Sequence, residues 1–273
     1  MHGTGNDYIY FDCMGGELEN PNELAKKLSD RHFSIGGDGI ILLCPSKVAD
    51  VKMRMFNADG SEGKMCGNGI RCLAKLAHDL GYVKGNKCKV QTLSGIKTLE
   101  LTLDKYGKVS AARVDMGAPL LEGQKIPSTY LGEKIVNRPL EVDGKIFNVT
   151  LVNTGNPHCV VFVEDPYGLN LDKLGVKFEN HSAFPERINT EFVKVIGKNH
   201  IEMRVWERGS GETLACGTGA CAAAVAAVLN GLCDKNADIT VSLSGGDLTV
   251  MYTDRTIYLY GGAELSFVGE IKL

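Results

Sequence analysis

The sequence lacks the features that mark several large classes of protein. No apolar run reaches the roughly 18 residues that a membrane-spanning helix needs, and no block of like charges indicates a nucleic-acid surface. The net charge is only −3, which argues against nucleic acid or an anionic membrane as the main partner. No secretory leader precedes the opening Met1-His2-Gly3. We therefore expect a cytoplasmic protein that binds neither nucleic acid nor a membrane.

The nine cysteines form no recognisable metal or redox motif. Their number is odd, no pair has C-x-x-C spacing, and no cysteine–histidine cluster has zinc-finger spacing. The glycine-rich stretches match neither the dinucleotide-binding nor the P-loop pattern. We expect reduced thiols, most of them buried as small apolar side chains, and we expect neither a metal nor an organic cofactor.

The chain repeats itself at one constant offset, 150 residues, which is the separation of Cys66 from Cys216. Three separate segments share this offset, whereas chance similarities would give unrelated offsets. The period is too long for a solenoid and indicates two domains of one fold that arose by duplication. The matching segments are Cys66-Gly67-Asn68-Gly69 with Cys216-Gly217-Thr218-Gly219, Gly5-Asn6 with Gly155-Asn156, and Met53–Phe56 with Met203–Trp206.

The pattern of apolar residues predicts a strand-rich chain with a few helices. A helix should begin at Pro21, with Asn20 as its N-cap, Glu23 completing a capping box, and Leu24 and Leu28 buried. Two further helices are so apolar that they should be buried, at Ile70–Leu80 and Ala220–Leu229. Strands are expected at Tyr8–Phe11, Ile40–Leu43, Val51–Phe56, Lys87–Val114 (three strands), Val160–Val163, Ile201–Trp206, Ile239–Leu243, Thr256–Tyr260 and Glu264–Ile271.

These elements predict an α+β fold of two pseudo-symmetric domains. Each should be a curved, barrel-like antiparallel sheet around a buried central helix, with the active site in the inter-domain cleft. We expect residues 1–116 to form the domain that carries Cys66, completed by residues 262–273, and residues 117–261 to form the domain that carries Cys216.

Cys66 and Cys216 are the predicted catalytic pair, because each immediately precedes one of the buried helices. The start of a helix offers free backbone N–H groups and the positive end of its dipole, which favour a thiolate and can bind a carboxylate. Two such thiols on opposite faces of a carbon next to a carboxylate could invert it, since one thiolate removes the α-proton and the other thiol delivers one. Cys72 and Cys221 lie inside the helices and are expected in the core.

The ordered motifs resemble those of the diaminopimelate epimerase family over nearly the whole chain. They are His2-Gly3-Thr4-Gly5-Asn6-Asp7, Asn57-Ala58-Asp59-Gly60-Ser61, Met65–Cys72, Gly155-Asn156-Pro157-His158, Pro185–Asn189, Glu207-Arg208-Gly209 and Ala215–Gly219. The resemblance implies a pyridoxal-independent isomerase that interconverts LL- and meso-2,6-diaminopimelate, in lysine and peptidoglycan precursor synthesis. A homodimer is plausible by resemblance.

The resemblance also implies the residues that surround the substrate. Cys66 and Cys216 would be the thiol pair, and Arg208 could grip a distal carboxylate with two hydrogen bonds. His158 either contacts the ligand or braces its loop. One departure is Gly39, where the family often has glutamine, and this should remove a ligand contact. The implied binding residues are Asn6, Asn57, Gly67, Asn68, Asn156, His158, Asn189, Glu207, Arg208, Gly217 and Thr218.

Three alternatives stand beside this hypothesis. A racemase or epimerase of another amino acid on the same fold is the nearest, although Asn68 differs from the histidine associated with proline racemases. A thiol–disulfide redox protein could use the same two cysteines, in which case oxidation should activate rather than inactivate it. A binding module without catalysis is disfavoured because both cysteines are present.

Overall fold

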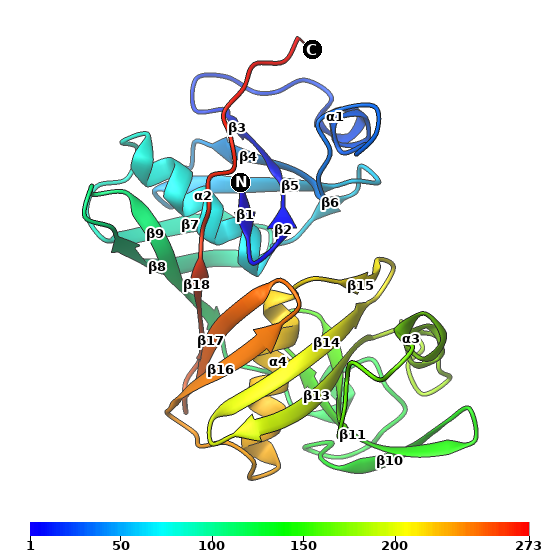
Figure 1. Cartoon of the computed structure of the whole chain (residues 1–273). Coiled ribbons are helices and arrows are strands. Elements are labelled where there is room, and N and C mark those ends of the chain that lie inside the picture. The colour runs from blue at the N-terminus through cyan, green and yellow to red at the C-terminus, as the bar shows by residue number, and fades with distance from the viewer. Residues whose placement is uncertain (273) are drawn as a thin grey trace. The chain divides into compact units, whose positions relative to one another are not determined.

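The computed structural model describes residues 1–272 and divides into two compact units (Figure 1). Unit 1 comprises Met1–Asp115 and Tyr260–Leu273, and unit 2 comprises Met116–Leu259. The chain passes between the units twice, inside strands β9 (Val109–Gly117) and β18 (Ile257–Gly262). Among the described residues, no helix is long and apolar enough to cross a membrane.

Unit 1 contains two helices, eight complete strands and most of a ninth strand, β9. The helices are α1 (Pro21–Leu28) and α2 (Gly67–Asp79). The strands before β9 are β1 (His2–Gly3), β2 (Asn6–Asp7), β3 (Ile9–Asp12), β4 (Gly39–Cys44), β5 (Val51–Asn57), β6 (Glu62–Gly63), β7 (Lys87–Thr92) and β8 (Gly95–Leu103). The hydrogen-bonded order of its main sheet is β3-β4-β5-β7-β8-β9.

Unit 2 contains the other helices and strands. Its helices are α3 (Leu171–Glu179), α4 (Gly217–Leu229) and the short 3-10 helix η1 (Gly123–Lys125). The strands before β18 are β10 (Arg138–Val142), β11 (Lys145–Asn153), β12 (Pro157–Phe162), β13 (Asn189–Gly197), β14 (His200–Glu207), β15 (Gly211–Thr213), β16 (Asp238–Leu243) and β17 (Gly246–Tyr252). The main sheet has the order β10-β11-β12-β13-β14-β16-β17-β18.

The two units share strand pairing down to the register. Ile40 pairs with Phe56 in unit 1, and Thr190 pairs with Trp206 in unit 2, at the same offset of 150. The parallel pair β3–β4 recurs as β12–β13, and the parallel pair β5–β7 recurs as β14–β16. The sheets are therefore mixed where we expected them to be antiparallel, because a helix intervenes in each of these connections and returns the chain in the same direction.

A buried helix packs against the sheet of each unit, as the sequence predicted. α4 contacts β11, β12, β13, β14, β16 and β17, and Figure 1 shows it running behind β14 and β16. Its Ala220–Ala227 segment is completely buried, which only small side chains allow at such close range. α2 contacts β4, β5, β7 and β8, and its Ile70 and Leu73 side chains are completely buried. Both helices begin three residues earlier than predicted, because glycines 67 and 217 already adopt helical geometry.

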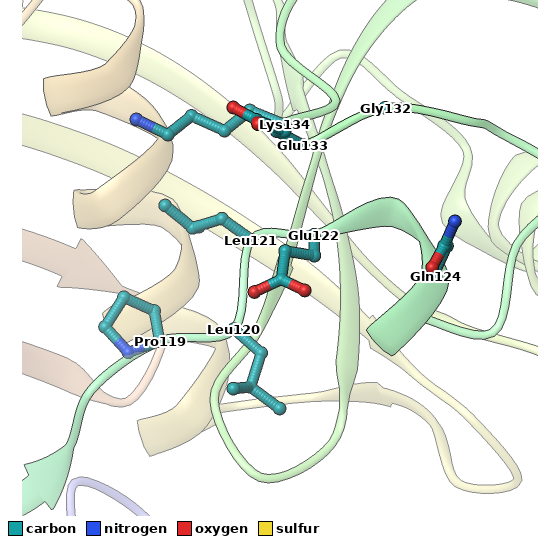
Figure 2. A pocket seen from close by; sticks show the side chains of 8 residues that line it. All are labelled: Pro119, Leu120, Leu121, Glu122, Gln124, Gly132, Glu133 and Lys134. Carbon is teal, nitrogen blue, oxygen red and sulfur yellow. The ribbon is translucent and has the colours of Figure 1, made fainter.

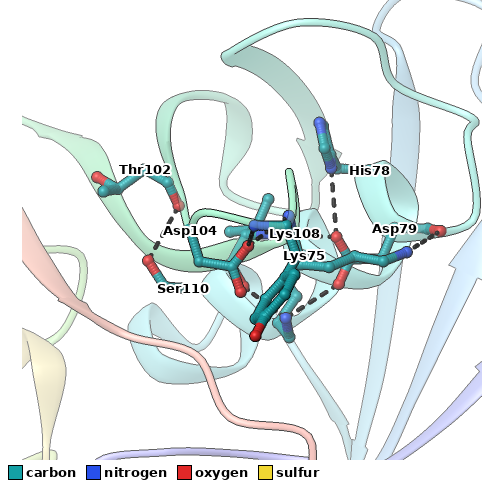
Figure 3. Close-up of polar contacts among 9 residues, drawn as sticks. Lys75, His78, Asp79, Thr102, Asp104, Lys108 and Ser110 are labelled. Carbon is teal, nitrogen blue, oxygen red and sulfur yellow. Dashed lines mark hydrogen bonds and ion pairs between the residues drawn. The ribbon is translucent and has the colours of Figure 1, made fainter.

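The last turn of α2 is polar, unlike that of α4. Oδ2 of Asp79 accepts a hydrogen bond from Lys75, and Oδ1 accepts one from the backbone N–H of Val109 and lies 3.3 Å from Nδ1 of His78 (Figure 3). The nearby hairpin turn is closed by Asp104, which accepts from the backbone N–H of Lys108. These bonds attach the end of α2 to the β8–β9 hairpin.

Several local predictions were wrong. Asn20 does precede α1, but it has a left-handed backbone (φ 47°) and its side chain makes no cap hydrogen bond, so the capping box with Glu23 does not form. Ala25 and Leu28, rather than Leu24, are the fully buried residues of that helix. The expected strand at 264–271 is absent among the described residues, where only Glu264 forms an isolated bridge, to His2.

Candidate functional site

In unit 1 the thiol of Cys66 is the N-cap of α2. Its backbone is extended (φ −124°, ψ 123°), and its Sγ accepts a hydrogen bond of 3.3 Å from the N–H of Gly69. Gly69 must be glycine here, because a Cβ would lie 2.5 Å from the side chain of Ile41. The thiol in turn donates to Oδ1 of Asn6 at 3.2 Å. Cys66 is therefore held at the positive end of a helix with a neutral amide beside it.

The amide of Asn6 is itself held by a carboxylate. Its Nδ2 donates to Oδ2 of Asp38 at 2.6 Å, and the other oxygen of Asp38 forms an ion pair with Arg31 at 3.0 Å. Burial raises the pKa of Asp38, and the nearby charge of Asp7 raises it further. Although burial opposes it, hydrogen bonding to Arg31 keeps the pKa of Asp7 below its ordinary value. This network orients Asn6 toward the thiol.

Asn68 is almost completely buried, with 1% of its surface exposed. Its Oδ1 accepts from Arg71 at 3.0 Å, and the same guanidinium bonds the carbonyl oxygens of Gly67 and Gly262 and the hydroxyl of Thr4. The side chain of Asn68 thus faces the arginine, which leaves the backbone of the glycine-rich turn as the anion-binding feature. Arg71 was missed from sequence because it was assigned to an apolar helix.

Two predicted features of unit 1 have a structural explanation. Asn57 ends β5, where its side chain donates to the hydroxyl of Ser61, and it pairs with Gly39. Gly39 has φ 150°, and a Cβ there would lie 2.1 Å from the carbonyl oxygen of Phe56. The glycine is therefore required by the backbone, and the loss of a ligand contact at this position stays a prediction.

In unit 2 Cys216 repeats the geometry of Cys66. It is the N-cap of α4, and its Sγ accepts from the N–H of Gly219 at 3.3 Å. The hydroxyl of Thr218 is a further polar neighbour, at 3.4 Å. Burial, followed by the negative charges of Glu207 and Glu191, raises the pKa of Cys216 well above that of a free thiol. Cys216 is therefore protonated near neutral pH.

Glu207 ends β14 beside Cys216. Its carboxylate accepts a hydrogen bond from Thr213 Oγ1. Burial raises the pKa of Glu207, while hydrogen bonds from Thr213 and Cys216 oppose that rise. The carboxyl groups of Glu207 and Glu191 both lie close enough to the thiol of Cys216 to affect its pKa.

His158 and Glu191 form a fully buried pair on β12 and β13. Nδ1 of His158 lies 2.7 Å from Oε1 of Glu191, and neither side chain is exposed to solvent. Nε2 of His158 lies 2.9 Å from Oδ1 of Asn156. The second carboxylate oxygen of Glu191 has no hydrogen-bonding partner among the described residues. His158 therefore contacts Asn156, and which of its two expected roles it has stays a prediction. Glu191 was missed because an isolated acidic residue in a strand gives no signal.

Asn189 and Arg208 complete the polar residues of unit 2. Asn189 donates to the carbonyl of Pro157 and accepts from the backbone N–H of Arg208 at 2.9 Å. The guanidinium of Arg208 is partly exposed and donates to the carbonyl of Glu186. Unit 2 therefore brings together Asn156, His158, Asn189, Glu207, Arg208, Cys216, Gly217 and Thr218, and unit 1 brings together Asn6, Cys66, Gly67 and Asn68.

The described residues bear on two other kinds of site, a metal centre and a cavity. No group of three or more His, Cys, Asp or Glu side chains within residues 1–272 is arranged to hold a metal ion. A shallow cavity of about 640 Å³ opens beside η1 in unit 2, and Figure 2 shows the lysine and glutamate side chains that border it. None of the predicted site residues lines this cavity. Its lining consists of Pro119, Leu120, Leu121, Glu122, Gln124, Gly132, Glu133 and Lys134.

The fold is shared with solved racemase and epimerase structures. A probable proline racemase from Agrobacterium radiobacter has a TM-score of 0.70 at 15% identity, covering 100% of this chain and 91% of that one. A hydroxyproline epimerase from Agrobacterium vitis has a TM-score of 0.66 at 13% identity, covering 97% and 87%. These similarities show that the chain has the fold of these solved structures.

The chain belongs to the diaminopimelate epimerase family, whose model matches residues 1–121 and 150–266. The diaminopimelate epimerase of Acetivibrio thermocellus is 52% identical over 100% of this chain and 97% of that protein. That of Methanococcus maripaludis is 48% identical over 100% and 98%. The resemblance inferred from the motifs is confirmed, and the chain is an isomerase of this family.

Proposed function

We propose that this protein interconverts LL- and meso-2,6-diaminopimelate by transferring a proton at one α-carbon, with Cys66 and Cys216 as its acid and base. The supporting observation is that each thiol is the N-cap of a buried helix and accepts from the N–H three residues later, at 3.3 Å in both units. Membership of the family supports the substrate. A small-molecule substrate of this kind has two ammonium and two carboxylate groups.

The proposed reaction needs two thiols in opposite protonation states. One thiolate removes the α-proton, and the other thiol delivers its proton to the opposite face of the same carbon. The reaction then leaves the first sulfur protonated and the second as thiolate, so atoms and charge balance. The N–H groups of the two glycine-rich turns stabilise the carboxylate as negative charge develops on it.

The remaining predicted residues keep their proposed roles. We assign the two units to the two expected domains, Gly67, Asn68, Gly217 and Thr218 to the reacting carboxylate, and Arg208 to the distal carboxylate. Asn6, Asn57, Asn156, Asn189 and Glu207 would bind the ammonium and carboxylate groups, with His158 supporting Asn156. A cytoplasmic location, a homodimer and the absence of a nucleic-acid partner complete the proposal.

Solvent deuterium incorporation tests the function directly. The purified protein is incubated in deuterated buffer with LL-diaminopimelate, meso-diaminopimelate, proline, hydroxyproline or glutamate, without pyridoxal phosphate. We expect deuterium at the α-carbon of diaminopimelate alone, together with interconversion of its isomers. Exchange on proline but not on diaminopimelate would replace this proposal with the racemase alternative. Activity that is lost on adding a thiol reductant would favour the redox alternative.

A further inference from the structure

We infer that the repeat-related asparagines Asn6 and Asn156 are locked with opposite amide polarity, and that buried Glu191 is the positioning residue for the second. Asn6 presents its carbonyl oxygen, whereas Asn156 presents its N–H₂ group. The inference rests on the proposed function for the identity of the ligand, but the two polarities follow from contacts inside each unit. Asn6 and Asn156 are separated by the repeat offset of 150 residues.

The polarity of Asn6 follows from the carboxylate beside it. Asp38 can only accept, so the group of Asn6 that lies 2.6 Å away must be its Nδ2. Arg31 pairs with Asp38 and keeps it in this role. The oxygen of Asn6 is thereby turned toward Cys66, whose thiol donates to it.

The polarity of Asn156 is set by a donor. Its Oδ1 lies 2.9 Å from Nε2 of His158, and the other ring nitrogen faces Glu191 at 2.7 Å. If Nε2 carries a proton, it donates to Oδ1, and Nδ2 of Asn156 is turned away from the buried pair. Asn156 is partly exposed, and its Nδ2 has no hydrogen-bonding partner among the described residues.

The burial of the pair supports this assignment. We place one proton on Nε2 and one between Nδ1 and Oε1 of Glu191, the arrangement in which Nε2 donates to Asn156. Whether the second belongs to the ring or to the carboxyl, the pair is neutral overall, which suits a site with no solvent exposure. Removing that second proton would leave a buried net negative charge. Glu191 thus keeps a proton available at Nδ1 and leaves Nε2 as the donor.

The repeat shows that the carboxylate at this position is not needed for the fold. The residue 150 positions earlier is Ile41, and each of the two side chains lies against the equivalent glycine in the first turn of its helix. A Cβ on Gly69 would approach Ile41 to 2.5 Å, and a Cβ on Gly219 would approach Glu191 Oε1 to 2.7 Å. An isoleucine fills this place in unit 1, so the buried glutamate of unit 2 serves its polar neighbours.

The consequence is that each unit presents a different group of its asparagine. Asn6 accepts and so suits an ammonium or a protonated thiol, whereas Asn156 donates and so suits a carboxylate. Turning the amide of Asn156 would present its oxygen to a carboxylate and weaken binding of that group.

Three substitutions distinguish the effect of the Asn156 amide orientation from the effect of the negative charge of Glu191. Glu191→Gln keeps a side chain that can donate to Nδ1 and so preserves the Nε2–H, but it removes the carboxylate. Glu191→Ile introduces the residue of the other repeat and leaves the ring without a partner. Thr190→Val is the matched control, because Thr190 is buried on the same strand and its hydroxyl has no hydrogen-bonding partner among the described residues.

We expect Glu191→Ile to raise KM for diaminopimelate by about 10- to 100-fold with a smaller fall in kcat, the size expected for losing a hydrogen bond to a charged group. Glu191→Gln should keep KM within about threefold of the wild type, and Thr190→Val should change neither constant. A KM for Glu191→Gln as high as that for Glu191→Ile would overturn the inference, because it would show that charge rather than orientation matters.

Asn156→Asp tests the presented group itself. A carboxylate can still accept from His158 but offers no donor to the ligand, so KM should rise more than in Asn156→Ala. A smaller rise than in Asn156→Ala would contradict the inference.

Nitrogen-15 spectra of histidine-labelled wild-type protein give a readout that does not depend on turnover. The signal of His158 is identified by its loss in His158→Gln. We expect a protonated Nε2 at neutral pH, and an unprotonated Nε2 would overturn the assigned polarity. If instead the wild type fails to exchange the α-proton of diaminopimelate while Nε2 is protonated, the proposed function fails and the amide polarity stands.

Discussion

The two halves of the chain have the same backbone but different charges around their thiols. Strand register, helix starts and the 3.3 Å bond from glycine N–H to cysteine sulfur recur at one offset. The side chains beside those sulfurs do not recur. Unit 1 has Tyr8, Ile41 and Asn57 where unit 2 has His158, Glu191 and Glu207.

This comparison separates the features that both units share, the glycine-rich turns, from the features that differ, the side chains around the thiols. Both turns must offer backbone N–H groups to an anion, and so both keep their glycines. In the proposed reaction one sulfur is a thiol while the other is a thiolate. Burial, followed by the negative charges of Glu207 and Glu191, raises the pKa of Cys216 and favours its protonated form.

Replacing either thiol should have the largest effect. Cys66→Ala and Cys216→Ala should each lower kcat for epimerisation by at least about 10²- to 10⁴-fold in both directions, because each removes one of two essential proton-transfer groups. Reaction rates from both isomers by chiral chromatography provide the measurement. Cys221→Ala, inside α4, is the control and should retain activity. If one alanine variant kept full activity, the two-base scheme would be wrong.

The second comparison concerns the buried Arg71, whose repeat equivalent is Cys221. Arg71→Met should lower the free energy of unfolding by about 2–4 kcal/mol, because the buried oxygens of Gly67, Asn68 and Gly262 lose a donor. Cys221→Ala should cost only about 1 kcal/mol. Urea denaturation followed by circular dichroism measures both. Equal losses would mean that the arginine network adds no stability specific to unit 1.

Reactivity toward iodoacetamide should distinguish the two thiols. Near neutral pH we expect Cys66 to be labelled at least about tenfold faster than Cys216, since Cys216 is buried and carboxylates raise its pKa. Glu207→Gln should speed labelling of Cys216 several-fold, because its pKa falls when the negative charge is removed. Peptide mapping by mass spectrometry resolves the nine cysteines. Faster labelling of Cys216 in the wild type would contradict the effect assigned to burial and to the two carboxylates.

The sequence was most informative where the two copies could be compared. The offset of 150 residues identified the two cysteine turns. The apolar composition identified α2 and α4 as buried helices, because a helix that is apolar on all sides is stable only when it is buried. Pairing direction was less accessible: the sheets were expected to be antiparallel, but whether strands on either side of a helix are neighbours depends on tertiary contacts.

Buried polar residues were the hardest to predict. Arg71 lies in an apolar stretch, and two of its partners, Gly67 and Gly262, are backbone carbonyls, which no side-chain pattern reveals. Glu191 lies in a strand that otherwise looks like core, and its partner His158 is 33 residues away in sequence. A position-by-position comparison of the two repeats would have found both. Arg71 corresponds to Cys221, and Glu191 corresponds to Ile41.

The smallest expected effect concerns an ion pair that both halves keep. Arg54 pairs with Glu62 at 2.8 Å, and Arg204 pairs with Glu212 at 2.7 Å, again 150 residues later. Such partly exposed pairs contribute about 0.2–1 kcal/mol, so Glu62→Gln and Glu212→Gln should lower the free energy of unfolding by similar small amounts.

The two arginines should differ where the glutamates do not. Arg204 is the less exposed, 13% against 30%, and it also donates to the carbonyls of Pro166 and Leu169 at 2.9 Å each. Arg204→Met should therefore cost about 1–2 kcal/mol more than Arg54→Met, because it leaves two carbonyls without a donor. Denaturant titration of the four variants measures both differences. The loss of unfolding free energy could differ between the two arginine variants by no more than it differs between the two glutamate variants. The extra bonds in unit 2 would then contribute nothing, and the two ion pairs would be energetically equivalent.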